Sequence, residues 1–108
     1  PAAMLPAQSW MANWQPVVDS LTRLHLAGEV LLGAAFAQPE TRDLFVPMLR
    51  ARGMDPDRVT PGEVGGTLTS GEHAALSTGL VRRLASMTEI ARERWLQAVR
   101  EAAGQVQV

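Results

Sequence analysis

The chain has 108 residues, of which 46% are hydrophobic, and a formal net charge of −1 at pH 7. A chain of this length buries about two thirds of the surface that its unfolded form exposes, so residues 1–108 are expected to form one domain with its own core. The sequence has no Cys, no Tyr and no Lys. These absences exclude thiolate nucleophiles, disulfides, zinc–thiolate and iron–sulfur sites, Schiff-base catalysis and the P-loop lysine.

The first residues of the sequence show no features of a secretory signal. Residues 1–8 contain two prolines and neither a basic region nor a sustained apolar run, so we expect a flexible arm. The apolar run over residues 30–37 is much shorter than the roughly 20 residues that a membrane-spanning helix needs. We therefore expect a cytoplasmic protein that does not bind membranes. The abundance of Ala, Leu, Arg, Gly and Val is typical of GC-rich coding and suggests a bacterial source.

A first helix is predicted over residues 16–37, with Pro16 near its first position, where the missing N–H has no helical partner to lose. Its apolar residues follow a heptad seam that ends in the small residues Gly28 and Ala35, which predicts close packing against another helix. A second apolar strip makes the C-terminal half of this helix apolar nearly all round. This half is therefore expected to be buried on two sides.

The middle of the chain is expected to form a kinked helical segment over residues 39–52. Pro47 lies inside it, where proline removes one backbone hydrogen bond and clashes one turn back. We therefore expect a kink, or two short helices that meet at Val46-Pro47. Gly53 is placed to end this segment.

A Gly/Pro-rich connection is predicted over residues 53–68. Within it, Thr60 and Glu63 have the spacing of a capping box, in which a hydroxyl and a carboxylate satisfy the first free N–H groups of a helix. The helix that begins there is expected to be one turn long, because Gly65 and Gly66 follow directly.

One long amphipathic helix is predicted over residues 70–103, with a second capping box at Thr69 and Glu72. Its apolar residues repeat every eleven positions, a period close to that of the α-helix, which favours a straight stripe and continuity through Gly79. At 1.5 Å per residue this helix would be roughly 50 Å long, whereas a globule of this size is only about 34 Å across. The elements together predict an all-α fold: a small helical bundle with a kinked middle segment and one long C-terminal amphipathic helix.

The excess length of the predicted helix indicates self-association. A second apolar strip on this helix includes Val81, Leu96 and Val99, and we expect it to pack against another chain. Trp10 and Trp14 are further interface candidates, because Trp is enriched at the energetic centres of interfaces, and core packing is the alternative for both. We predict a homo-oligomer, most simply a dimer, and consider a protein partner as well. No nucleic-acid binding is predicted, because glutamates interleave with the arginines of the long helix.

Two histidines lie on apolar stripes and are the strongest candidates for chemistry. His25 and Glu29 are four residues apart, a spacing that places both on one helix face and suits a metal pair or a carboxylate-oriented base. Convergence with His73 in a bundle core would give a small enzyme or a metal site. The structural interpretation is favoured, because three-ligand sites need more donors than this chain supplies. We therefore predict no metal site, no cofactor and no catalytic residue.

The leading hypothesis is a non-enzymatic helical module that self-associates and presents an apolar helix face or groove to a partner. One alternative is a bundle that binds a small apolar ligand or cofactor in an aromatic and Met-lined pocket. The other is a small enzyme or metal site that uses His25 and His73. The candidate residues for ligand binding are His25, Glu29, Phe36, Met48, His73, Met87 and Trp95.

Overall fold

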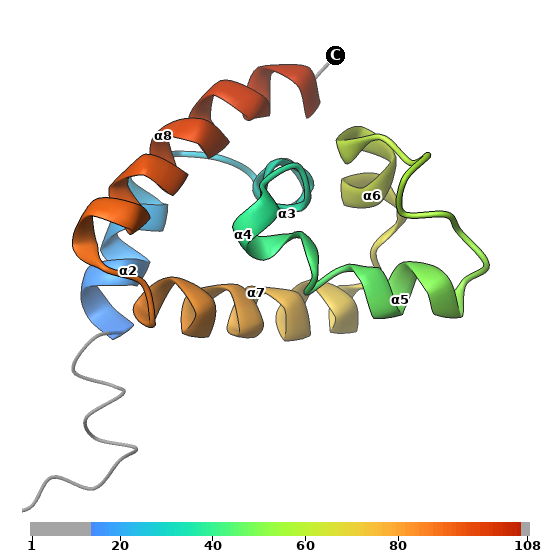
Figure 1. Cartoon of the computed structure of the whole chain (residues 1–108), viewed down its shortest axis with the longest axis horizontal. Helices are drawn as coiled ribbons and strands as arrows, with labels where there is room; N and C mark the ends of the chain where they lie inside the picture. Colours follow the sequence, from blue (N-terminus) through green and yellow to red (C-terminus); the bar gives the residue numbers. More distant parts are fainter. Residues whose placement is uncertain (1–13, 107–108) are drawn as a thin grey trace, which may run out of the picture.

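The computed structural model describes residues 14–106, which form helices joined by turns (Figure 1). The helices, labelled as in Figure 1, are α2 (Trp14–Thr22), α3 (Gly28–Phe36), α4 (Pro39–Arg42), α5 (Val46–Ala51), α6 (Pro61–Thr67), α7 (Ser70–Ala85) and α8 (Glu89–Val106). No strand occurs in this part of the chain, and the predicted all-α bundle is confirmed. Each helix over residues 14–106 falls short of the length or the apolar character that crossing a membrane requires. The arm predicted over residues 1–8 lies outside the described residues.

Helix α3 is the centre of the fold. Val30 and the residues from Leu32 to Phe36 are buried. Helices α6, α7 and α8 pack against α3, and Figure 1 shows it nearly end-on between them. A helix covered on several sides needs apolar residues around most of its circumference, which is the composition of α3. The prediction that this stretch is buried on two sides is confirmed.

Two glycines allow α3 and α6 to approach each other closely. A Cβ atom on Gly33 of α3 would lie 2.5 Å from the carbonyl oxygen of Pro61, and one on Gly65 of α6 would lie 2.4 Å from the carbonyl oxygen of Glu29. Both distances are shorter than a van der Waals contact and both neighbours are main-chain atoms, so only glycine fits at either position. The sequence predicts close helix packing at Gly28 and Ala35, and the closest approach of main chains occurs instead at Gly33 and Gly65.

Helix α6 begins where the sequence predicts and ends later. Thr60 Oγ1 accepts from the N–H of Glu63, and the Glu63 carboxylate accepts from the N–H of Thr60, so the capping box is confirmed. The prediction that Gly65 and Gly66 end this helix is wrong, because it continues through both to Thr67. Packing against α3 compensates for the low helix propensity of the two glycines.

The middle segment forms two short helices, as predicted, but the break lies at residues 43–45, just before Val46-Pro47. Helix α4 ends in a turn, and α5 begins at Val46 with Pro47 in its first turn. Gly53 ends α5 with a φ of 74°, and its N–H and that of Met54 donate to carbonyls in the last turn of α5. This glycine-terminated helix end is confirmed.

The prediction of one helix over residues 16–37 is wrong. The chain forms α2 and α3 instead, with a turn over residues 23–27. His25 lies in this turn with a φ of 56°, in the left-handed region, where His is better tolerated than most other residues with a side chain. The turn buries Leu24 in the core and redirects the chain, so that α2 packs on α7 while α3 enters the centre of the fold.

The prediction of one continuous helix over residues 70–103 is also wrong. Two helices take its place, α7 and α8, separated by a turn over residues 86–88. Helix α7 begins at the predicted capping box of Thr69 and Glu72 and continues through Gly79. Figure 1 shows α8 turning back from the end of α7, and both helices contact α3. The bend therefore lets both halves of the apolar stripe cover the central helix.

Two hydroxyl side chains fix the turn between α7 and α8. Ser86 Oγ donates to the carbonyl of Arg83 at 2.7 Å. Thr88 Oγ1 accepts from the N–H of Ala91 at 3.1 Å, at the start of α8. Such side chains satisfy backbone groups that a continuous helix would pair internally, which is why Ser and Thr favour helix ends.

The bend also places the second apolar strip of this region inside the chain. Val81, Leu96 and Val99 are 7%, 5% and 0% exposed and belong to the core. Trp14 is half-buried and packs against the same core, while Trp10 lies outside the described residues. Helix length therefore no longer argues for a partner, and the residues of this strip are not free to contact one.

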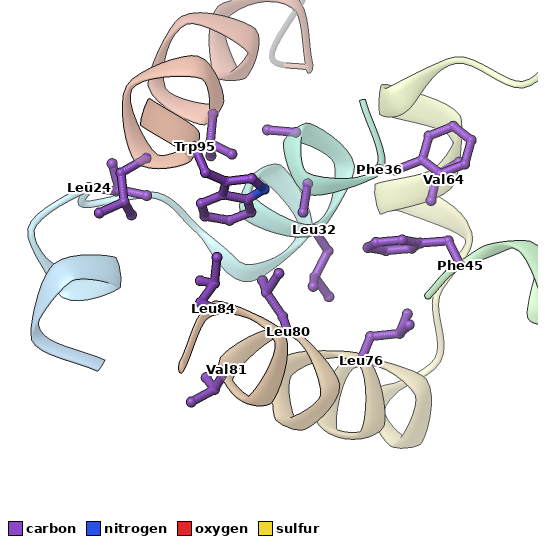
Figure 2. Close-up of a cluster of buried hydrophobic side chains, with 14 of the residues drawn as sticks. Leu24, Leu32, Phe36, Phe45, Val64, Leu76, Leu80, Val81, Leu84 and Trp95 are labelled. Atoms are coloured by element: carbon purple, nitrogen blue, oxygen red, sulfur yellow. The ribbon is translucent and has the colours of Figure 1, made fainter. Parts of the chain in front are cut away.

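A buried hydrogen-bond chain links α8 to α4 and α3. Trp95 Nε1 donates to Thr41 Oγ1 at 3.1 Å, and Thr41 Oγ1 donates to the carbonyl of Ala35 at 2.6 Å. Figure 2 shows the Trp95 indole between α8 and the α7 side chains Leu80 and Leu84. These two hydrogen bonds satisfy the polar groups of Trp95 and Thr41, whose side chains are both 0% exposed.

Candidate interaction surface on helix α8

The aromatic and Met residues predicted to bind a ligand belong to the core. Phe36 and Trp95 are 1% and 0% exposed, and Phe36 packs edge-to-face on Phe45 with 5.7 Å between ring centroids. Met48 and Met87 are half-buried and pack against this core. None of these side chains lines either of the two clefts described below.

The prediction that His25 and Glu29 share one helix face is wrong, because the turn before α3 separates them. His25 is exposed in the turn, and Glu29 is exposed in the first turn of α3, beside a cleft of about 300 Å³ between α3, α6 and α8. His73 is half-buried in the first turn of α7, with Nδ1 3.5 Å from the position of a Cβ on Gly28. Over residues 14–106, no group of three or more His, Cys, Asp or Glu side chains could hold a metal ion.

Two carboxyl groups with lowered pKa values stabilise the scaffold. Hydrogen bonds from Arg83, at 2.7 and 2.9 Å, lower the pKa of Asp43 below its ordinary value. The N–H of Thr69 lowers the pKa of Glu72 in the capping box of α7, and the nearby Arg52 lowers it further. Both carboxylates hold α7 in place. Glu72 caps its start, and Asp43, in the segment between α4 and α5, binds Arg83 near its end.

Helix α8 has one covered side and one open side. The covered side carries Trp95, Leu96, Val99 and Ala103, each at most 5% exposed. With about 100° between successive residues, the opposite side carries a row of exposed residues. In Figure 1, α8 forms an outer edge of the molecule. We name this row the α8 stripe; it consists of Ile90, Glu93, Arg94, Gln97, Arg100, Glu101 and Gly104.

An apolar side chain lies at the N-terminal end of the α8 stripe. Ile90 is 68% exposed, and no other large hydrophobic side chain within residues 14–106 is exposed. Single exposed apolar residues are common on proteins, so the significance of Ile90 depends on what surrounds it. Its surroundings are a cleft and a row of charges.

The cleft is open and has a volume of about 730 Å³. One wall is the end of α2 and the turn after it, with Ser20, Arg23 and Leu24, and the other wall is α8, including most of the α8 stripe. Ser20 Oγ donates to the carbonyl of Pro16 at 2.8 Å, so this hydroxyl is not poised against a general base. Because charged and polar residues predominate in the lining, the cleft suits side chains of a protein partner better than a small apolar molecule.

The charges of the α8 stripe have few partners within their own chain. Glu93, Arg94, Arg100 and Glu101 each lack an opposite charge three or four residues away in α8, which is the spacing of helical ion pairs. Glu93 pairs with Arg23, in the turn after α2, at 3.6 Å, and both side chains are more than half exposed. Over residues 14–106, the other three side chains make no ion pair.

Comparison with known proteins leaves this surface unassigned. No family model, curated protein or solved structure matches the chain. The α8 stripe is therefore interpreted from its own chemistry. Sequence reasoning missed it, although the signal was present as exposed residues at alternating spacings of four and three, opposite the apolar side of the same helix.

Proposed function

We propose that this chain is a non-enzymatic helical module that self-associates through the α8 stripe. The observation that carries the proposal is the charge pattern of the stripe. Two acidic residues, Glu93 and Glu101, lie on either side of two basic residues, Arg94 and Arg100, so the surface is neutral as a whole. Because each side of the stripe carries one acidic and one basic residue, a second copy of the chain can supply an opposite charge for each of the four.

Ile90 and the cleft support the same proposal. Association would remove the exposed apolar surface of Ile90 from water, which is favourable in free energy. The cleft between α2 and α8 lies beside the charged row and has room for side chains of the second copy. The proposed surface thus combines an apolar contact with a charged rim, as protein interfaces do.

Sedimentation velocity tests the proposal. The wild-type chain is measured from about 5 µM to about 500 µM, a range that covers weak association, and the sedimenting mass should approach that of two chains. Ile90→Glu introduces a charge at an exposed position, so the fold should persist while the single chain predominates. Ala75→Glu introduces the same charge at an exposed position of α7 and should associate like the wild type.

Two results would contradict the proposal. One is a wild-type chain that sediments as a single copy throughout this range. The other is an Ile90→Glu variant that associates as strongly as the wild type, because the α8 stripe would then lie outside the interface.

A further inference from the structure

We infer that two copies of α8 pair antiparallel across a two-fold axis that passes by Gln97. This inference rests on the proposed self-association and specifies which residues of the two copies meet. It follows from the positions of the charges, Ile90 and Gly104 along and around the helix.

The first argument is the match of Glu93 with Arg100. In an antiparallel two-fold pair, a residue before the axis meets a residue equally far beyond the axis in the other copy. At 1.5 Å per residue, Glu93 lies about 6 Å before Gln97 and Arg100 lies about 4.5 Å after it. Glu93 of each copy is therefore within about 1.5 Å, measured along the helix, of Arg100 of the other.

The same arithmetic pairs Arg94 with Glu101. Arg94 lies about 4.5 Å before Gln97 and Glu101 lies about 6 Å after it. Residues seven positions apart differ by only about 20° around a helix, so each acid–base pair stays on one flank. The two-fold axis brings the same flank of the two copies together. The pairing therefore yields ion pairs along both edges of the contact.

A parallel arrangement would pair the same charges in another way. A two-fold axis along the helices brings opposite flanks together, so Arg94 would meet Glu93 of the other copy and Arg100 would meet Glu101. Residues in the middle of the stripe would meet their own counterparts, so Ile90 would face Ile90 at one end and Gly104 would face Gly104 at the other, which prevents even packing along the contact. The ends of the α8 stripe therefore favour the antiparallel arrangement.

The ends of the α8 stripe also match in shape. Ile90 lies seven residues before Gln97 and Gly104 lies seven residues after it, so each Ile90 meets the Gly104 of the other copy. No atom lies within 4 Å of the position of a Cβ on Gly104, so the surface there is open. A large apolar side chain thus packs over a position without a side chain, and this lets the two helices approach.

The cleft receives part of the second copy. Arg100 of the second copy would enter beside α2, where Glu93 already faces Arg23 at 3.6 Å. Glu93 would then lie between two guanidinium groups, one from each chain. The pairing consequently uses the cleft as well as the helix surface.

A disulfide trap tests the position of the axis. The chain has no Cys, so a single introduced thiol reports on one position. Each Cα lies about 2.3 Å from its helix axis, so helices packed 8–10 Å apart bring the Cα atoms of a residue on the two-fold axis to about 3.5–5.5 Å from each other, a range that overlaps the separations found in disulfides. We expect mild oxidation to link Gln97→Cys into two-chain species. Gln105→Cys is the control, because its two thiols would be about 24 Å apart along the helices.

Charge reversal with rescue tests the pairs. Arg94→Glu should weaken association about tenfold or more, because two ion pairs become repulsive contacts. Glu101→Arg in the same chain should restore association by re-forming both pairs with reversed signs. Arg50→Glu, at an exposed position of α5, makes the same charge change away from α8 and should associate like the wild type.

The outcomes separate this inference from the proposed function. If the wild type does not associate, the proposed function fails. If the wild type associates and Ile90→Glu disrupts it, the function stands, and the antiparallel pairing is overturned when Gln97→Cys links no faster than Gln105→Cys. Failure of Glu101→Arg to restore the Arg94→Glu variant overturns the pairing as well.

Discussion

Replacement of Gly65 by Ala tests the close approach of α3 and α6, on which the core depends. The added Cβ would lie 2.4 Å from the carbonyl oxygen of Glu29, which is a main-chain atom and has little freedom to move. Helix propensity alone would make this substitution stabilising by up to about 1 kcal/mol. Overpacking typically costs about 1–3 kcal/mol, and a rigid neighbour places the cost at the upper end. We expect a net loss of about 1–2 kcal/mol in the free energy of unfolding.

Gly66→Ala is a matched control in the same helix. No atom lies within 4 Å of the position of its Cβ, so this variant should gain up to about 1 kcal/mol in the free energy of unfolding. Thermal unfolding followed by circular dichroism measures both variants against the wild type. At about 4–8 °C per kcal/mol, the Tm of Gly65→Ala should fall by roughly 4–16 °C, and that of Gly66→Ala should rise by up to about 4–8 °C. Equal stabilities of the two variants would refute the close approach.

Three further predictions concern the core and the helix ends. Thr41→Val leaves the indole N–H of Trp95 without its acceptor and should lower the free energy of unfolding by about 1–3 kcal/mol in urea denaturation, whereas Thr41→Ser should lose less. Because hydrogen bonds from Arg83 lower the pKa of Asp43 from 3.8, the charged pair stabilises the fold above that pH, and the stabilisation is lost as the pH falls through the lowered pKa. Asp43→Asn should therefore lose less stability below pH 3.8 than the wild type, and identical acid profiles would contradict this. Thr88→Ala removes the hydroxyl that accepts from the first turn of α8 and should cost about 1 kcal/mol in chemical denaturation; an unchanged midpoint would contradict a capping role.

The helix starts of this fold are predictable from sequence because their causes are local. The capping boxes of α6 and α7 each involve a Thr and a Glu three residues apart, Thr60 with Glu63 and Thr69 with Glu72, and no distant residue is needed to form them. The end of α5 at Gly53 is local in the same sense. The burial of α3 is also predictable, because an apolar surface all round leaves a helix few alternatives to a central position.

The two helix breaks are less predictable. Hydrophobic periodicity shows which side of a helix is apolar, but it does not show whether the chain continues in the same direction or turns. Apolar residues keep the same phase before and after the turn at residues 86–88. The local signal was the pair of hydroxyl residues Ser86 and Thr88. Ser86 caps the end of α7, and Thr88 caps the start of α8. At His25 the left-handed conformation depends on how the chain reaches α3, and no glycine marks it.

The candidate surface depends on these breaks. A straight helix over residues 70–103 would expose the strip of Val81, Leu96 and Val99, whereas the bend buries all three residues. The surface that stays open is the opposite side of α8. The hydrogen bond between Thr41 and Trp95 joins residues 54 positions apart, so no local sequence pattern predicts it.

The distance between two copies of residue 105 tests the central claim most directly. Gln105→Cys carries a nitroxide label at an exposed position of α8, and pulsed electron paramagnetic resonance measures label-to-label distances. Antiparallel pairing about Gln97 separates the two positions by about 24 Å along the helices, so we expect a distribution centred at about 25–35 Å. Absence of any defined distance would contradict self-association through α8, and a distance below about 20 Å would contradict the antiparallel arrangement.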